Sequence, residues 1–175
     1  MGQAKRRKEA GERVTPCRTC TYCCTLPLIE ALEKPPYRPC RHIAGGGCSI
    51  YGKPERPAAC SAYSCAYVVA RAGDGPERNR IPHPLDCAAY FHRDPVEKVI
   101  FLFVDPARPQ VWKASDLVAF LRLQVEAGFA LFITDRGRQM VVRDTVQFDA
   151  VVAHDMVEVA AREGRPLDLP SFAEA

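Results

Sequence analysis

Hydrophobic and polar residues follow a regular pattern only in the second half of the chain. Residues 98–104, KVIFLFV, form an apolar run that is typical of a buried strand. Residues 115–127 repeat apolar positions at helical spacing, which predicts an amphipathic helix that Ser115 can cap and Gly128 can end. The inner stripe of this helix is Leu117, Phe120, Leu121 and Val125.

Two further strands and a second helix are predicted after Gly128. Residues 130–134 and 139–143 flank an Asp-Arg-Gly-Arg turn, which is typical of a β-hairpin. Residues 146–162 then form a long helical pattern that ends before a glycine and a proline. The order strand, helix, strand, strand, helix predicts an α+β fold, with a small, mainly antiparallel sheet and two helices in the C-terminal lobe.

The first half of the chain has little apolar periodicity. Residues 16–65 are rich in Cys, Pro and Gly, and only residues 26–34 offer a helical pattern. We expect few regular elements in this segment, and bound metal is the available means of ordering it. The predicted regions are a basic arm (1–14), a cysteine-cluster metal-binding region (15–71), a linker or loop (72–94) and an α+β lobe (95–175).

Eight of the nine cysteines fall within residues 17–65. Their spacing is C-x2-C-x2-CC, then C-x7-C, then C-x4-C, and a C-x2-C step brings two thiolates from one turn to the same cation. A buried structural cysteine would find no apolar core to join in so polar a segment. The predicted metal ligands are therefore Cys17, Cys20, Cys23, Cys24, Cys40, Cys48, Cys60 and Cys65.

The spacing leaves the number and identity of the metal ions open. Adjacent side chains diverge in extended or helical backbone, so Cys23 and Cys24 are awkward partners on one ion. The first run is therefore expected to serve two metals or one polynuclear cluster, and two sites of four thiolates would use all eight cysteines. Such ligands suit Zn²⁺, as one or two ions, and they equally suit iron or an iron–sulfur cluster.

Other residues near the cluster have simpler interpretations. Cys87 follows the predicted loop and is expected to be a core thiol rather than a ninth ligand. His42 lies two residues after Cys40 and could replace a cysteine ligand. Three arginines lie near the cysteines in sequence and could balance thiolate charge: Arg18, Arg41 and Arg56. Surface positions are the more ordinary expectation for them.

Charge and hydropathy narrow the cellular setting. Residues 1–94 carry 15 Lys and Arg against 9 Asp and Glu, but thiolates offset this basic excess, so it argues poorly for a nucleic-acid partner. The basic N-terminus lacks the apolar segment of a secretory signal, and no stretch approaches the ~20 apolar residues of a membrane span. We expect a cytoplasmic protein away from the membrane, where clustered cysteines bind metal rather than form disulfides.

Positions between the cysteines make the pattern more specific. Cys48-Ser49-Ile50-Tyr51 is followed by Arg56-Pro57 and then by Cys60-x2-Tyr63-x-Cys65. With these positions, residues 17–65 resemble the YkgJ-like cysteine-cluster family, which is described as a zinc- or iron-chelating domain. The chain departs from the family in having Thr21 where Gly is frequent, and in having four residues rather than two between Tyr51 and Arg56.

The resemblance implies metal chelation, and three functions remain open. The first is a non-catalytic chelating or interaction module, for which an unknown protein partner is possible. The alternative is an iron–sulfur-dependent redox or protein-modifying enzyme, because a flagellin lysine N-methylase has a similar cysteine cluster. The third is a nucleic-acid-binding zinc module. The basic residues at Lys5–Lys8 have no aromatic residues between them, which argues against this function. No catalytic residue is assigned.

Overall fold

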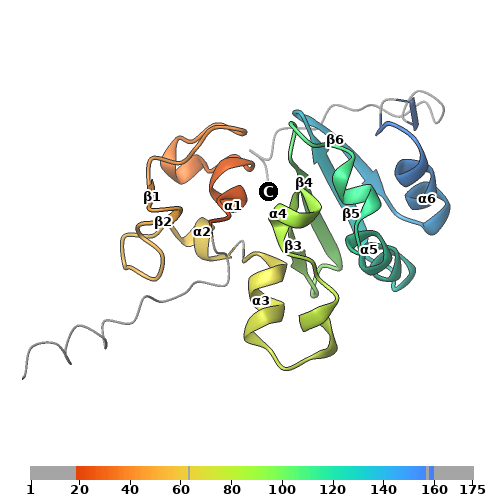
Figure 1. The fold of residues 1–175 in the computed structure, drawn as a ribbon, viewed down its shortest axis with the longest axis horizontal. Coiled ribbons are helices and arrows are strands. Elements are labelled where there is room, and N and C mark those ends of the chain that lie inside the picture. Colours follow the sequence, from red (N-terminus) through yellow and green to blue (C-terminus); the bar gives the residue numbers. More distant parts are fainter. Residues whose placement is uncertain (1–18, 63, 157, 160–175) are drawn as a thin grey trace, which may run out of the picture.

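The computed structural model describes residues 19–62, 64–156 and 158–159 of the chain (Figure 1). The basic arm predicted at residues 1–14 and the first predicted ligand, Cys17, lie outside these residues. The chain folds into two parts. We call residues 19–62 the cysteine lobe and the described residues from Ser64 onward the sheet lobe.

The cysteine lobe contains short elements joined by turns, as its composition predicts. In chain order they are α1 (Tyr22–Thr25), the 3-10 helix η1 (Glu30–Leu32), β1 (Ile43–Ala44), β2 (Gly47–Cys48) and α2 (Ala58–Ala62). β1 and β2 pair antiparallel, with Ile43 opposite Cys48. The two residues between these strands, Gly45 and Gly46, both have positive φ, which glycine adopts without strain.

The sheet lobe contains a four-stranded sheet and its helices. Its elements are α3 (Ala66–Ala72), η2 (Pro76–Asn79), α4 (Pro84–Cys87), β3 (Ala89–Asp94), β4 (Val99–Val104), η3 (Val111–Ala114), α5 (Leu117–Glu126), β5 (Ala130–Asp135), β6 (Arg138–Val142) and α6 (Thr145–Ala153). The strand order is β3-β4-β5-β6, in which only β4 and β5 are parallel and α5 forms their crossover. The α+β class with a mainly antiparallel sheet is confirmed.

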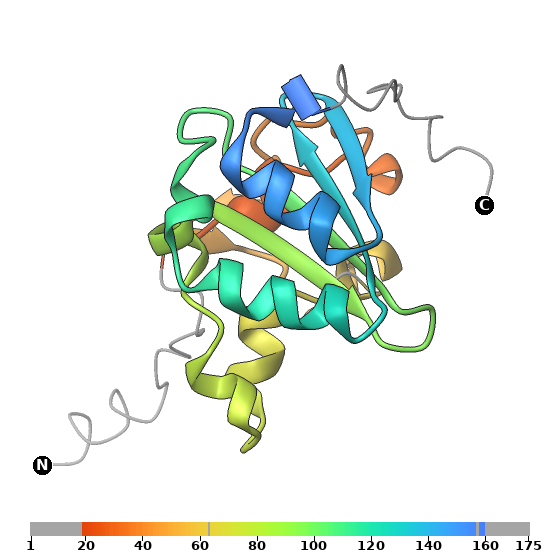
Figure 2. The same cartoon turned by 90° about the vertical axis from the view of Figure 1, so that its right-hand side faces the viewer.

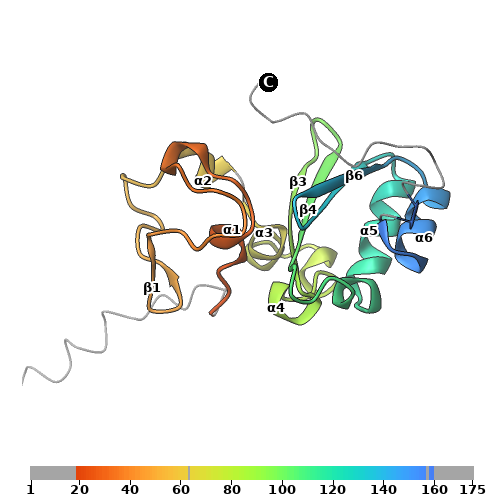
Figure 3. The ribbon, with the colours of Figure 1, turned by 90° about the horizontal axis from the view of Figure 1, so that it is seen from above.

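The sheet separates two layers of the molecule. α5 and α6 cover one face, and the cysteine lobe lies on the side of the opposite face (Figures 2 and 3). The helix-covered face carries side chains with no solvent exposure: Ile100, Leu102, Leu131, Ile133 and Val142. Because side chains alternate along a strand, the opposite face receives Tyr90 and Phe103, whose rings stack with centroids 5.4 Å apart. This second face is where the cysteine lobe approaches.

Strand β3 is absent from the sequence-based prediction and falls within residues 72–94, where a linker or loop was expected. Its first three residues, Ala89, Tyr90 and Phe91, are all buried. A strand covered on both faces shows no alternation of polar and apolar residues, which is the pattern that reveals a half-buried strand. The remainder of this segment does contain exposed turns around η2.

The last predicted helix is interrupted. α6 ends at Ala153, where the backbone becomes extended at His154, and the described residues 156 and 158–159 are helical again. Residues 160–162 of the predicted helix lie outside the described residues. The His154 carbonyl accepts a hydrogen bond from Nζ of Lys113, so its partner is a side chain rather than a backbone N–H of the helix. The other predicted elements of this lobe lie within two residues of the observed β4, α5, β5 and β6.

Side-chain hydrogen bonds join the two lobes. The Tyr22 hydroxyl on α1 donates to Oδ2 of Asp105 at 2.7 Å, just after β4, and accepts from Arg108. At another point, the Tyr37 hydroxyl accepts a 2.9 Å hydrogen bond from the backbone N–H of Gly137 in the β5–β6 turn. Within the described residues, no helix is both long and apolar enough to cross a membrane.

Candidate metal centre

The described predicted ligands come from separate short segments. Cys23 and Cys24 lie on α1 and Cys20 precedes it, whereas Cys48 ends β2. Cys40 lies between η1 and β1, Cys60 lies on α2, and Cys65 is the N-cap of α3. None of these described cysteines forms a disulfide.

Four of these thiols form one group, which we call the inner group: Cys24, Cys40, Cys48 and Cys60. The charges of Cys24, Cys40 and Cys48 each raise the pKa of the Cys60 thiol, after the larger effects of burial and of Arg56. The N–H of Cys40 also donates to the backbone carbonyl of Cys24 at 3.0 Å, which ties two of the segments together. The fold therefore gathers cysteines that are up to 36 positions apart in the sequence.

A buried lysine lies beside the inner group. Lys34 is only 5% exposed, and its Nζ donates to the backbone carbonyls of Thr25 at 2.9 Å, Pro27 at 2.5 Å and Pro35 at 2.8 Å. Burial lowers the pKa of this ammonium, while the thiolate charges of Cys40, Cys24 and Cys60 act to raise it. All three donors of the ammonium are engaged by backbone carbonyls, which hold Lys34 in place near the inner group.

A second cation, Arg56, lies beside the inner group in the turn before α2. The Arg56 guanidinium donates to the carbonyl of Cys60 and lies 4.7 Å from the centre of the Tyr51 ring. Its Nε is buried and has no hydrogen-bond partner among the described residues. Its positive charge acts to lower the pKa of the Cys24, Cys48 and Cys60 thiols. Arg56 is therefore placed to offset thiolate charge, although a surface position was the more ordinary expectation for it.

The thiols of the inner group differ in acidity. Hydrogen bonding with Cys23 lowers the pKa of Cys24 from 9.0 to about 7 against the effect of burial, and Cys48, Arg56 and Lys34 add smaller effects in the same direction. Burial raises the pKa of Cys48. A cysteine binds metal as the thiolate, so the lowered pKa of Cys24 favours metal binding by this thiol near neutral pH.

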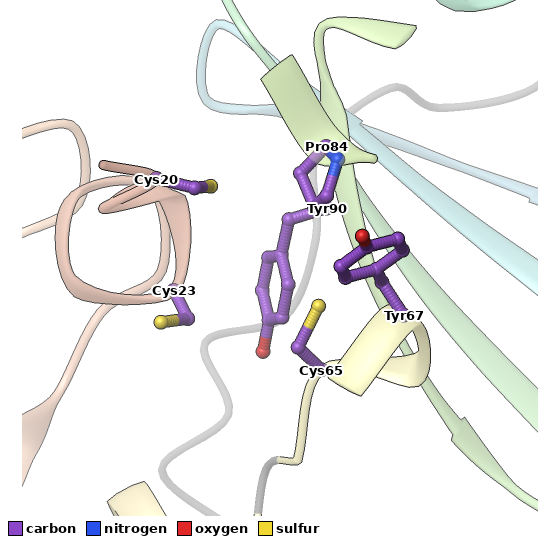
Figure 4. A pocket seen from close by; sticks show the side chains of 6 residues that line it. All are labelled: Cys20, Cys23, Cys65, Tyr67, Pro84 and Tyr90. Carbon is purple, nitrogen blue, oxygen red and sulfur yellow. The ribbon is translucent and has the colours of Figure 1, made fainter. Parts of the chain in front are cut away.

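The remaining described ligands lie at the boundary between the lobes. Cys20, Cys23 and Cys65 line a small hollow together with Tyr67, Pro84 and Tyr90 (Figure 4). Its volume is about 10 Å³, which is close to the least that holds one water-sized particle. In Figure 4, Cys20 and Cys65 direct their sulfur atoms toward the tyrosine rings, and Cys23 turns its sulfur away from Tyr90.

The two adjacent cysteines do not diverge as the sequence led us to expect. The sulfur atoms of Cys23 and Cys24, both on the one-turn helix α1, are only 3.8 Å apart. Two thiolates on one tetrahedral zinc, each about 2.3 Å from the metal, would stand about 3.8 Å apart as well. Cys23 therefore connects the hollow to the inner group.

The donor chemistry of the site fits zinc or iron. The described donors are all sulfur, cations lie beside them, and one pair already has the spacing of ligands that share an ion. In the described part of the chain, however, no group of three or more His, Cys, Asp or Glu side chains has the geometry to hold a metal ion. Binding would therefore have to draw the sulfur atoms closer together.

Other candidate residues take ordinary positions. Cys87 is 2% exposed within the core of the sheet lobe, and burial raises the pKa of its thiol to about 11. Arg41 donates to the carbonyl of Leu32 on an exposed surface. His42 contributes its backbone carbonyl, which accepts from the N–H of Ser49 at 2.8 Å. Arg18 lies outside the described residues.

Sequence reasoning did not identify Lys34 or the tyrosines of the hollow. The one signal for Lys34 in the sequence is the pair of prolines that follows it. A proline has no backbone N–H to donate and cannot continue a regular helix, so the chain turns there. Tyr67 and Tyr90 lie outside the cysteine-rich segment, and they reach the site only because α3 and β3 pack against it.

Comparison with known proteins gives no match: no protein-family model, no curated protein and no solved structure is significantly similar to the chain. The resemblance of residues 17–65 to the YkgJ-like family therefore stays a prediction made from the residues themselves.

Proposed function

We propose that this protein binds zinc or iron through the thiolates of the cysteine lobe, and that it acts in the cytosol as a non-catalytic chelating or interaction module. The observation that supports the proposal is the inner group, in which thiols from separate segments lie near enough to act on the pKa of Cys60 and of the buried Lys34, with Arg56 beside Cys60. Cysteines that only pack in a core are uncharged, so a buried charged group such as the Lys34 ammonium beside them would have no stabilising role.

The charges of the inner group match this function. Four thiolates and one divalent ion leave two negative charges, and Lys34 and Arg56 offset them from positions next to the sulfur atoms. Without a metal, ionising all four thiols would place four negative charges in a partly buried space, which is strongly unfavourable. Lys34 and Arg56 can offset two thiolates, and ionisation of all four thiols requires a bound cation as well.

The packing of the cysteine lobe points the same way. Its buried apolar side chains among the described residues are few: Leu26, Ile29, Cys40 and Ile50. So small a set cannot offset the conformational entropy of ordering about forty residues. Binding of a structural zinc ion contributes about 10–16 kcal/mol to folding in small domains, which is ample for such a lobe.

The test is elemental analysis with a visible absorption spectrum, on protein purified without oxygen and without added metal. We expect zinc without colour, or iron, at one or two ions per chain. Cys60→Ser should lower the metal content, and Cys87→Ser, a matched change at a buried core thiol, should leave it unchanged. Iron with labile sulfide and a brown colour would favour the enzyme alternative, and a chain that binds no metal would contradict the proposal.

A further inference from the structure

Cys23 and Cys24 bring their sulfur atoms into contact, 3.8 Å apart, on the single turn of α1. Both residues are half-buried, so a small oxidant in solution can reach them. The two sulfur atoms of a disulfide are about 2.05 Å apart. A further approach of these two atoms would therefore join them, and no other segment of the chain has to move toward them.

The helix that carries the pair is held weakly. None of the residues of α1 is buried, and the helix begins at Thr21 without a side-chain cap. Two backbone hydrogen bonds of 2.8 Å define it, from the N–H of Cys24 to the carbonyl of Thr21 and from the N–H of Leu26 to the carbonyl of Tyr22. A helix of one turn is marginal by itself. The backbone of α1 can therefore change its conformation at little cost.

A disulfide between adjacent residues requires such a change. Across a trans peptide bond the two Cα atoms are about 3.8 Å apart, whereas roughly 4.4–6.8 Å is usual across a disulfide. Adjacent side chains also diverge in a helix, so α1 has to lose its helical backbone when the bond forms. Strain of this kind makes a disulfide easier to reduce, and labile disulfides commonly serve in regulation.

We propose that Cys23 and Cys24 form a reversible disulfide on exposure to peroxide, and that this disulfide releases the metal ion of the inner group. The release rests on the proposed function, because Cys24 belongs to the inner group, whereas the disulfide needs only the two sulfur atoms. Metal is bound by the thiolate, and a disulfide has none. The same two residues are therefore metal ligands and an oxidation site.

The reaction balances with hydrogen peroxide as the oxidant. One thiolate attacks a peroxide oxygen, the O–O bond breaks, hydroxide leaves, and the sulfur becomes a sulfenic acid. The neighbouring thiol attacks that sulfur, the S–O bond breaks, and the departing hydroxide takes the thiol proton and leaves as water. The product is the same whichever sulfur reacts first. A small thiol then reduces the disulfide through a mixed disulfide and is itself oxidised to its own disulfide.

Tyr22 connects the pair to the sheet lobe. It precedes Cys23 directly, and its hydroxyl donates to Oδ2 of Asp105 at 2.7 Å. The other carboxylate oxygen of Asp105 accepts from the N–H of Ala107 at 3.0 Å, so the Ala107 amide reports on this carboxylate. When α1 loses its helical backbone, the Tyr22 hydroxyl leaves Asp105. Oxidation thereby removes one of the contacts between the lobes.

The first experiment locates the disulfide in the full-length, zinc-loaded chain. The chain is treated with hydrogen peroxide, free thiols are alkylated, and chymotrypsin cuts after Tyr22 and Leu28. The fragment of residues 23–28 contains Cys23 and Cys24 and no other cysteine. We expect it to be unalkylated and lighter than its reduced form by a pair of hydrogen atoms. An alkylated fragment, or one joined to another cysteine-containing fragment, would overturn the proposal.

The second experiment tests reversibility by measuring zinc content. Peroxide should release zinc from the unaltered chain, and a small thiol with fresh zinc should restore the full content. In Cys23→Ser the sulfenic acid of Cys24 lacks its adjacent thiol and is oxidised on to sulfinic acid, so zinc should be lost without recovery. Cys87→Ser, a change at a buried core thiol, should behave like the unaltered chain. Full recovery in Cys23→Ser would remove Cys23 from the reaction.

The third experiment follows the Ala107 amide by ¹H–¹⁵N NMR. Peroxide should shift this signal in the unaltered chain but not in Tyr22→Phe, which lacks the hydroxyl that donates to Asp105. Equal shifts in both proteins would show that Tyr22 does not transmit the change.

The outcomes separate this inference from the proposed function. A chain that binds zinc but forms no disulfide between Cys23 and Cys24 keeps the proposed function and overturns the inference. A chain that binds no zinc but forms this disulfide contradicts the proposed function and the release of metal, and it keeps the oxidation site.

Discussion

The two lobes are held together by different kinds of interaction. The sheet lobe surrounds a continuous core of fully buried side chains that include Trp112, Leu117 and Phe148. The cysteine lobe buries few apolar side chains, and it also buries the ammonium of Lys34. Hydrophobic burial therefore suffices for the first lobe, whereas the second depends on its polar contacts and, by our proposal, on metal.

The two lobes should therefore respond to different changes. A core substitution in the sheet lobe should leave metal binding intact, and removal of metal should leave the sheet intact. Only the contacts between the lobes, such as those of Tyr22 and Tyr37, should transmit an effect from one to the other.

The largest expected effect is that of removing the metal. Chelation, or Cys60→Ser, should unfold the cysteine lobe, because about 10–16 kcal/mol of binding free energy is lost from a lobe with little core. In ¹H–¹⁵N NMR, the signals of the Ile43–Cys48 hairpin should collapse toward random-coil positions while those of β4 and β5 persist. Cys87→Ser is the control and should retain the hairpin signals. A hairpin that survives chelation would refute the contrast between the lobes.

The next largest effect is that of a cavity in the sheet lobe. Phe148 on α6 has no solvent exposure, so Phe148→Ala should lower the free energy of unfolding of this lobe by about 3–5 kcal/mol. Urea denaturation followed by circular dichroism measures it, and metal content should not change in the folded variant. Val146→Ala, on the same helix at a position 78% exposed, is the matched control with little expected effect.

A smaller effect is expected from removing the buried ammonium of the cysteine lobe. Lys34→Met keeps the length of the side chain but removes the donor to three carbonyls and a charge beside the thiolates. We expect metal affinity to fall about 10- to 100-fold, as for other residues that support metal ligands. Competition with a chromophoric chelator measures it. Lys53→Met, at an exposed position of the same lobe, should have no such effect, and equal losses in both variants would remove Lys34 from the site.

The same contrast explains how much the sequence predicted. α5 was predicted from its helical period, β4 from its apolar run, and β5 and β6 from the turn between them, all of which are local features. β3 was missed because both of its faces are covered at its start. Which side of a strand faces the core can be predicted from the strand's own residues. Whether its other side is also covered depends on a lobe that is distant in the sequence.

The candidate site was predicted in composition but not in arrangement. The spacing of the cysteines predicts which residues are ligands, because C-x2-C steps are local, and this assignment stays a prediction. Their arrangement depends on tertiary contacts. Cys65 follows α3 onto the sheet core, and the Lys34 ammonium is held by the carbonyls of Thr25, Pro27 and Pro35. Neither contact has a signature in the order of the residues.

The smallest expected effect is that of weakening the contact between the lobes. Tyr22→Phe keeps the ring but removes the hydroxyl between Asp105 and Arg108, which remain bonded to each other at 3.1 Å. The metal-loaded chain should therefore lose only about 1 kcal/mol of unfolding free energy, while the NMR signal of the Gly137 amide shifts as the lobes separate more often. Tyr51→Phe, which alters a 47% exposed ring of the cysteine lobe, is the matched control. An unchanged Gly137 signal in Tyr22→Phe would show that the lobes stay docked without this hydroxyl.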